Sequence, residues 1–131
     1  MKKILVVLLA MLLLTGCSGG NTDHVQIDTG TSARYEEAEI IEAMDLVLRK
    51  FEKGFEGCYM TKLWYDEAAS ADEATAWARE YDAEEAIVLY CNYWVDGSGR
   101  NPTQTPNSMY KNWNWILVRN GRKWELKDWG Y

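Results

Sequence analysis

The sequence has little of the residue types on which common enzyme sites depend. Its 131 residues include one histidine, three cysteines and two prolines. The histidine, His24, lies in a polar segment rich in Gly, Thr and Asp, where we expect a solvated linker residue rather than a catalytic or metal-binding one. No histidine is therefore at hand to activate a thiol, and no phosphate-binding loop, dinucleotide fingerprint, zinc-ligand spacing or serine-hydrolase elbow is present. The sequence predicts no metal and no cofactor.

Positive charge is also scarce. Lys and Arg number 14 against 20 acidic residues, so the formal net charge is −6. Nucleic acids and anionic lipid headgroups attract proteins through clustered basic residues. The sequence therefore argues against a nucleic-acid partner and against membrane binding by surface charge.

Long apolar runs are limited to the N-terminus. Lys2 and Lys3 precede an apolar run of 11 residues, 4–14, which is too short to span a bilayer as a helix. Leu14-Thr15-Gly16-Cys17 follows and closely resembles the lipobox of bacterial lipoproteins, in which the cysteine is diacylated and becomes the first residue after cleavage. We therefore predict a signal peptide at 1–16, lipidation of Cys17 and a lipid-anchored location facing outside the cytoplasm. A secretory peptide cut elsewhere and an uncleaved anchor are the alternatives.

Cleavage would leave 115 residues with a formal charge of −8, because residues 1–16 hold two lysines and no acid. The stretch that follows, 17–31, is polar and without periodicity, and reads as the lipidated cysteine and a flexible tether. Fourteen flexible residues reach roughly 20 Å. We expect one domain, 32–131, lifted off the headgroups by this tether.

Two helices are expected in this domain. Residues 32–53 place apolar side chains at helical spacing, with Ser32 as N-cap and Gly54 as the stop. Ser70 and Glu73 have the spacing of a capping box and predict a short second helix over 70–81. The long helix is expected to cover a sheet.

Four strands are expected with them. Residues 58–66 and 85–95 are rich in β-branched and aromatic side chains, and both faces of 85–95 are apolar. Residues 110–131 are two alternating runs joined by Asn120-Gly121, a strong hairpin signal. A two-residue loop would place Leu117 opposite Trp124 and Trp113 opposite Asp128; a bulge at Gly121 would change this register. The element order predicts an α+β domain with a curved, mostly antiparallel four-stranded sheet.

Two features of the predicted strands and loops remain open. Cys58 and Cys91 both lie in strands, and an exported domain allows either a disulfide or two buried thiols. Residues 96–108 hold both prolines and form a thirteen-residue loop, a length that is either functional or disordered in a small domain.

Four segments resemble a family of small lipoproteins of Gram-positive bacteria. They are L-W-Y-D-E at 63–67, E-A-I-V-L-Y at 85–90, N-W-N-W-I-L-V-R at 112–119 and K-D-W-G-Y at 127–131. The resemblance covers roughly residues 33–131 and implies the nuclear-transport-factor-2 (NTF2)-like, cystatin-related fold: a cone-shaped sheet whose mouth often forms a pocket. Relatives with this fold use the pocket for catalysis, binding or dimerisation, so the fold does not choose among them. Enzymes of the fold usually place an aspartate or an Asp–His pair inside the cone, and this chain has no histidine there.

The candidate site residues follow from the expected hairpin and cone. Asp128 is the candidate acid or base, because the hairpin register puts it on the apolar face beside Trp113; the alternative is a carboxylate bonded to backbone at a strand end. Trp94, Tyr110 and Trp129 are the aromatic residues expected near the open mouth or at the surface, where rings can stack on a ligand. The other tryptophans are expected in the core.

Three functions are compatible with these residues. The first is a membrane-tethered, extracytoplasmic module that binds a small ligand or an envelope protein without chemistry. The second is a small hydrolase or isomerase using Asp128. The third is an accessory subunit of an envelope complex, docked or dimerised through an exposed sheet face. The residues favour the first, because no catalytic set accompanies Asp128.

Overall fold

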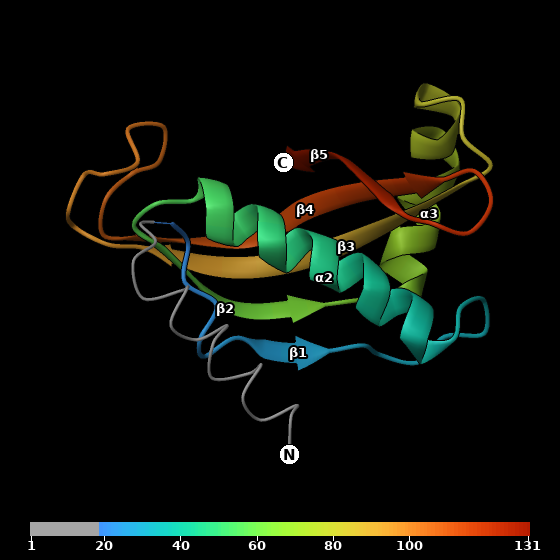
Figure 1. The fold of residues 1–131 in the computed structure, drawn as a ribbon, viewed down its shortest axis with the longest axis horizontal. Coiled ribbons are helices and arrows are strands. Elements are labelled where there is room, and N and C mark those ends of the chain that lie inside the picture. The colour runs from blue at the N-terminus through green and yellow to red at the C-terminus, as the bar shows by residue number, and fades with distance from the viewer. Residues whose placement is uncertain (1–18) are drawn as a thin grey trace, which may run out of the picture.

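The computed structural model describes residues 19–131, so the signal peptide and Cys17 lie outside the described residues. This part of the chain forms two helices and five strands (Figure 1). In chain order these are β1 (Gln26–Asp28), α2 (Glu37–Gly54), β2 (Cys58–Trp64), α3 (Glu67–Glu80), β3 (Glu85–Val95), β4 (Ser108–Arg119) and β5 (Glu125–Gly130). The predicted α+β class is confirmed.

The sheet is open and mixed, with its strands in the order β1-β2-β3-β4-β5. β2 to β5 pair antiparallel as expected, whereas β1 lies parallel to β2 at the edge. The expected four strands are therefore five, because residues 26–28 of the predicted tether add a strand. The cone is not confirmed: α2 lies across one face of the sheet (Figure 1). Its apolar side chains pack into the core on that face.

Helix α2 begins at Glu37 and not at the predicted residue 32. Its N-cap is Glu36, which forms a capping box with Glu39. The predicted cap, Ser32, instead accepts the backbone N–H groups of Arg34 and Tyr35 through Oγ, which holds the preceding loop in a turn. The apolar stripe of the helix was predicted correctly; its buried residues are Ile40, Ala43, Met44, Val47 and Phe51.

Helix α3 begins one turn earlier than predicted, at Glu67, with Asp66 as N-cap. The Asp66 carboxylate accepts the Ala69 N–H at 3.3 Å. Ser70 is therefore an interior helix residue, and its buried Oγ accepts the N–H of Val88 in β3 at 3.0 Å. β2 ends its pairing with β3 at Trp64 and Tyr90, so Ser70 supplies an acceptor beyond the end of β2.

Replacing Ser70 with alanine is expected to lower the free energy of unfolding by about 1–2 kcal/mol, because the buried Val88 N–H loses its acceptor. Thr75→Ala, at an exposed position of the same helix, is the matched control and should change it by less than about 0.5 kcal/mol. Urea unfolding followed by circular dichroism measures both. Equal stability of the two variants would contradict this role of Ser70.

The segment before β1 is bound to the domain and is not a free tether. The Gly20 N–H donates to the Glu52 carbonyl at 3.2 Å, and Asn21 exchanges backbone hydrogen bonds with Cys58 and Met60 of β2. A Cβ at Gly19 would clash with the Glu52 carbonyl oxygen, and one at Gly20 would clash with the Phe51 carbonyl oxygen and ring. Glycine is thus required here because the chain packs closely against the end of α2. The composition of this segment had instead suggested a flexible tether.

The register of the β4–β5 hairpin differs from the register predicted for a two-residue loop. β4 ends at Arg119 and β5 begins at Glu125, so the connection has five residues. Leu117 pairs with Leu126 and Ile116 with Asp128, with an irregularity between these two pairs. The bulge thus lies within β5, at Lys127, and not at Gly121. The register prediction was wrong because Asn-Gly here belongs to a longer turn, in which Asn120 Oδ1 accepts the Glu84 N–H and the Gly121 N–H donates to Glu84.

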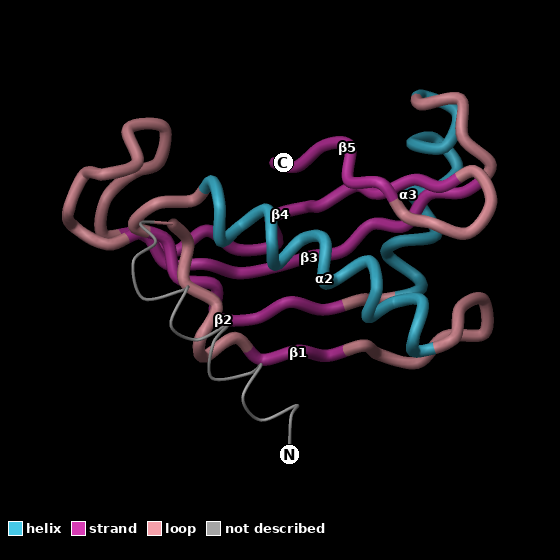
Figure 2. The backbone as a smooth tube through the Cα atoms, viewed as in Figure 1, coloured by secondary structure: helices cyan, strands magenta, loops and turns pink. Residues whose placement is uncertain are grey.

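The two faces of the sheet carry different layers. The face under α2 holds the main core, which includes Trp115, Leu117, Trp124 and Tyr93. α3 covers the opposite face only around Val88, Tyr90, Ile116 and Val118 (Figure 2). Among the described residues, no helix is long and apolar enough to cross a membrane.

Candidate functional site

The three aromatic residues expected near the open mouth or at the surface lie in separate surroundings, and Trp94 and Trp129 are exposed. Trp94 is 37% exposed and, between the buried Tyr93 and Val95, points to the face away from α2. Tyr110 stacks at 5.1 Å on Tyr93, inside the α2 layer. The ring of Trp129 lies 5.8 Å from that of Trp115, with Lys50 Nζ 4.9 Å from its centroid. The structure does not bring Trp94, Tyr110 and Trp129 together.

Asp128 does not occupy the apolar position beside Trp113. It pairs with Ile116, whose side chain is on the α3 face, and it is exposed. Its Oδ1 accepts the N–H of Trp129 at 2.9 Å, which is the strand-end bond given above as the alternative. The bulge in β5 is the cause, since one extra residue reverses the faces of Asp128 and Trp129. The placement that motivated an acid or base role for Asp128 is therefore wrong.

Both cysteines of the domain are buried free thiols. Cys58 pairs with Val95 and Cys91 with Leu63, so the two lie four strand positions apart, about 13 Å, beyond the reach of a disulfide. Burial raises the pKa of Cys58 to about 11 and that of Cys91 to about 12. Cys91 Sγ also accepts the Trp115 Nε1–H at 3.1 Å, so this thiol has a structural partner.

The loop 96–108 is ordered by its own side chains. The Asp96 carboxylate accepts hydrogen bonds from the N–H and the hydroxyl of Ser98, and it forms a 3.0 Å ion pair with Arg100. Gln104 accepts the Tyr93 hydroxyl at 2.9 Å, which attaches the loop to the core. Within residues 19–131, no three His, Cys, Asp or Glu side chains are grouped to hold a metal ion.

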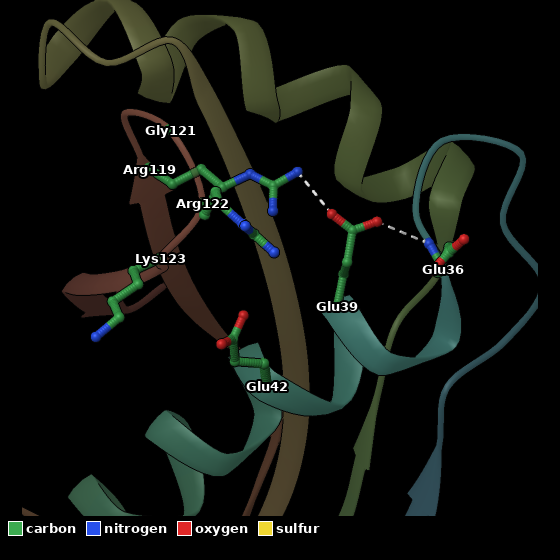
Figure 3. Close-up of a pocket in the computed structure, with 7 residues that line it drawn as sticks. All are labelled: Glu36, Glu39, Glu42, Arg119, Gly121, Arg122 and Lys123. Carbon is green, nitrogen blue, oxygen red and sulfur yellow. Dashed lines mark hydrogen bonds and ion pairs between the residues drawn. The ribbon is translucent and has the colours of Figure 1, made fainter.

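A charged cleft lies where the sequence suggested no site, between the first turns of α2 and the β4–β5 turn (Figure 3). It has a volume of about 640 Å³. Its lining is almost entirely charged: Glu36, Glu39, Glu42, Arg119, Gly121, Arg122 and Lys123. It opens at the end of α2 opposite to Gly20.

Arg119 is the structural centre of this cleft. Only 10% of its side chain is exposed. Its guanidinium binds Glu39 at 2.9 Å and the cross-strand carboxylate of Glu85 at 3.1 Å. Its Cζ lies 4.2 Å from the centroid of the Trp124 ring, a cation–π distance. Trp124 Nε1–H donates in turn to the Glu39 carbonyl at 3.1 Å, so the helix and the turn are held together on both sides of the arginine.

These contacts favour the charged forms of Arg119 and Glu39. Burial opposes the charge of Arg119, but the hydrogen bonds to Glu85 and Glu39 outweigh it and leave its pKa raised. The Glu36 N–H and Arg119 together lower the pKa of Glu39. Burial, assisted by the Glu85 carboxylate, raises the pKa of the neighbouring Tyr35. The centre is thus a charged cluster fixed by ion pairs and hydrogen bonds.

The rim of the cleft carries the unpaired charge. Arg122 and Lys123 are exposed and form no ion pair with any residue in 19–131. Arg122 points toward the space between the turn and α2, whereas Lys123 points away from the helix (Figure 3). Glu36 and Glu42 stand exposed on the helix side. One wall is therefore cationic and the other acidic.

The sequence signal for this cleft was present but weak. Arg119, Arg122 and Lys123 are three cations within five residues around the Asn-Gly turn. Their meeting with Glu39 depends on α2 crossing the sheet at this turn, a contact between residues 80 positions apart. Local patterns carry no information on such a crossing.

Comparison with known proteins identifies the N-terminal segment. Residues 1–18 match the prokaryotic membrane lipoprotein lipid attachment site. The protein is a lipid-anchored membrane lipoprotein. Cys17, the cysteine of this segment, carries the anchor and places the domain on the extracytoplasmic face, as predicted. No curated protein and no solved structure matches the chain, so the comparisons give no family or fold beyond the lipoprotein signal.

Ionisation should limit the stability of this lipoprotein at both ends of the pH scale. The pKa of Glu67 is lowered by hydrogen bonds from Ser32 and the Ala33 N–H, and that of Asp96 by bonds from Ser98. Burial raises the pKa values of Tyr65 and Tyr93, as it does those of the two thiols. A carboxyl group with a lowered pKa stabilises the folded state when the pH is above the pKa of that group in the unfolded chain. A thiol or phenol with a raised pKa stabilises the folded state when the pH is below the pKa of that group in the unfolded chain.

We therefore expect the Tm to be highest between about pH 5 and pH 9. It should fall below this range as the carboxylates take up protons. Above pH 9 it should fall as thiols ionise more readily in the unfolded chain, and more steeply above pH 10 as tyrosines do the same. Circular dichroism melts of the lipoprotein in detergent at fixed ionic strength measure this. A Tm that rises above pH 9 would contradict the burial of these groups.

Proposed function

We propose that this lipoprotein is a non-catalytic recognition module that binds an envelope protein through the charged cleft between α2 and the β4–β5 turn. The observation that carries the proposal is Arg119, buried and fixed by Glu39, Glu85 and Trp124 beneath a rim of unpaired cations. A cluster fixed in this way has little side-chain freedom to lose when a partner binds. Binding rather than chemistry is favoured because the groups with altered pKa values in the cleft are held in ion pairs or buried.

The chemistry of the two walls indicates the kind of partner. Arg122 and Lys123 suit carboxylates, and Glu36 and Glu42 on the opposite side suit cations. A protein segment with side chains of both signs fits this arrangement better than a purely anionic or apolar small molecule. Opposed charged walls give a complex its specificity and orientation more than its affinity.

The position of the cleft supports the same proposal. α2 has 18 residues and is about 27 Å long, and Gly20 is bound near its C-terminal end. The cleft, at the N-terminal end, is thus far from the residue nearest the lipid anchor. A partner in the envelope could reach it while the lipoprotein stays in its membrane.

The order of elements supports a finer proposal on ancestry. After β1 the chain runs helix, strand, helix and three antiparallel strands, the order expected from the sequence pattern, and its segments resemble NTF2-like lipoproteins of Gram-positive bacteria. We propose that the domain is a member of that group in which α2 fills the place of the pocket. The binding surface then lies outside the place of that pocket, at the N-terminal end of α2.

Site-specific photocrosslinking in cells tests the proposed function. A photoreactive residue replaces Lys123 in the full-length lipoprotein, and the control carries it at Arg79, an exposed position of α3. We expect a discrete protein adduct from position 123 and none from position 79. Adding Arg122→Gln should weaken the adduct several-fold, whereas Lys53→Gln at the other end of α2 should leave it unchanged. No adduct at 123, or equal adducts at both positions, would overturn the proposal.

A further inference from the structure

Three exposed apolar side chains form one row on the face of the sheet that α3 leaves open. Tyr59, Trp94 and Met109 are 40%, 37% and 43% exposed. They are direct cross-strand partners: Tyr59 pairs with Trp94, and Trp94 with Met109. Each has inward-facing neighbours, such as Cys58 and Met60 beside Tyr59, so all three point away from the core.

The described segment that follows the lipidated cysteine in sequence joins the same row at Asn21. Asn21 forms a β-bridge with Tyr59, so the row runs across four adjacent chain segments, from Asn21 to Met109. Asn21 is four residues after Cys17, and four extended residues span at most about 14 Å. The polar headgroup layer of one leaflet is itself about 5–8 Å thick. The anchor is therefore too short to lift Tyr59 far from the membrane surface.

The attachment of this segment to the domain is firm. Gly20 donates to the Glu52 carbonyl, and Thr22 Oγ1 donates to the Glu52 carboxylate. Gly19 and Gly20 pack so closely on the end of α2 that a Cβ at either would clash with backbone oxygens. Residues 19–22 are therefore fixed to the domain by hydrogen bonds and close packing, and they do not act as a free tether.

We propose that Tyr59, Trp94 and Met109 form a membrane-contact surface, seated at the headgroup–acyl boundary of the membrane that holds the lipid on Cys17. Tyr and Trp favour this boundary because each has an apolar ring and a polar group that stays hydrated. The contact is apolar, which agrees with a domain whose net negative charge gives it no attraction to anionic lipid. It orients the domain with the cleft at Arg119 away from the bilayer, and it is independent of any partner there.

A fluorescent label at single positions tests the contact. Met109→Cys is labelled with an environment-sensitive probe in the full-length lipidated protein, and Arg122→Cys, at the other end of the domain, is the control. Cys58 and Cys91 are buried with raised pKa values, and the Cys17 thiol carries the lipid, so the new thiol reacts selectively. The proteins are reconstituted into vesicles of phosphatidylethanolamine and phosphatidylglycerol with or without a lipid that carries a spin-label quencher.

We expect quenching several-fold stronger at 109 than at 122, with a blue shift of the probe at 109 that is absent in detergent-free Cys17→Ser protein. Tyr59→Ser combined with Trp94→Ser should remove most of this difference while acylation at Cys17 keeps the protein on the vesicles. Equal, weak quenching at both positions would overturn the proposal. So would quenching at 109 that needs high protein density in the vesicle, since this would assign the row to a second copy of the chain.

Discussion

Replacing Arg119 with alanine is expected to lower the free energy of unfolding by about 2–3 kcal/mol and the Tm by about 10 °C. The substitution leaves Glu39 and Glu85 near each other without their shared cation, and it removes the guanidinium from the Trp124 ring. The effect stays at the low end of the range for a broken buried ion pair because about a third or more of each carboxylate is exposed.

Arg122→Ala is the matched control for Arg119, since it removes a cation from the same cleft without breaking an ion pair. It should change the unfolding free energy by less than about 0.5 kcal/mol. Thermal and urea unfolding of the three proteins measure the difference. Similar stabilities for both variants would mean that the Arg119 cluster does not hold α2 to the β4–β5 turn.

Replacing Cys17 with serine is expected to abolish acylation completely. The lipid is attached through the cysteine sulfur, and no other cysteine lies in the matched segment, residues 1–18. Metabolic labelling with a fatty acid and the intact mass of the purified protein measure the loss. The lipid accounts for the membrane attachment, so the unacylated protein should also leave the detergent-rich phase in a phase-partition experiment.

Cys58→Ala is the control for Cys17, because Cys58 is a buried residue of β2 far from the signal in sequence. Its acylation should match that of the unchanged protein even if the domain is less stable. Labelled fatty acid retained by the Cys17→Ser protein would contradict the assignment of the anchor.

Local patterns predicted most elements but fewer of their ends. The apolar stripe of α2 and the strands β2, β3 and β4 were found because their periodicity reflects which face is buried. The helix starts were misplaced because Ser32 and Ser70 have cap-forming side chains that the fold uses elsewhere, for a turn and for the Val88 N–H. A hydroxyl can bond several nearby donors, and only the packed structure selects one.

The candidate site was missed for a related reason. Asp128 and Trp129 were assigned to faces by strict alternation, and a single bulge in β5 exchanged those faces. Arg119 drew no attention because a lone arginine at a strand end is common. Its importance comes from the convergence of Glu39, Glu85 and Trp124, which are contributed by three separate elements.

The sequence by itself determined the lipid-anchored location, the class of fold and the absence of a common catalytic motif. Each of these depends on residues adjacent in the chain: the apolar run before Cys17, the periodicity of α2 and the alternation of the strands. Tertiary structure alone decided that Gly19 and Gly20 pack on α2, and that Asn21 extends the row of Tyr59 and Trp94. The composition of 17–31 is typical of a flexible linker. Composition does not exclude pairing with a sheet, because backbone hydrogen bonds to a strand edge require no particular side chain. A segment of any polarity can therefore join a sheet, and only the position of the edge of β2 shows that this one does.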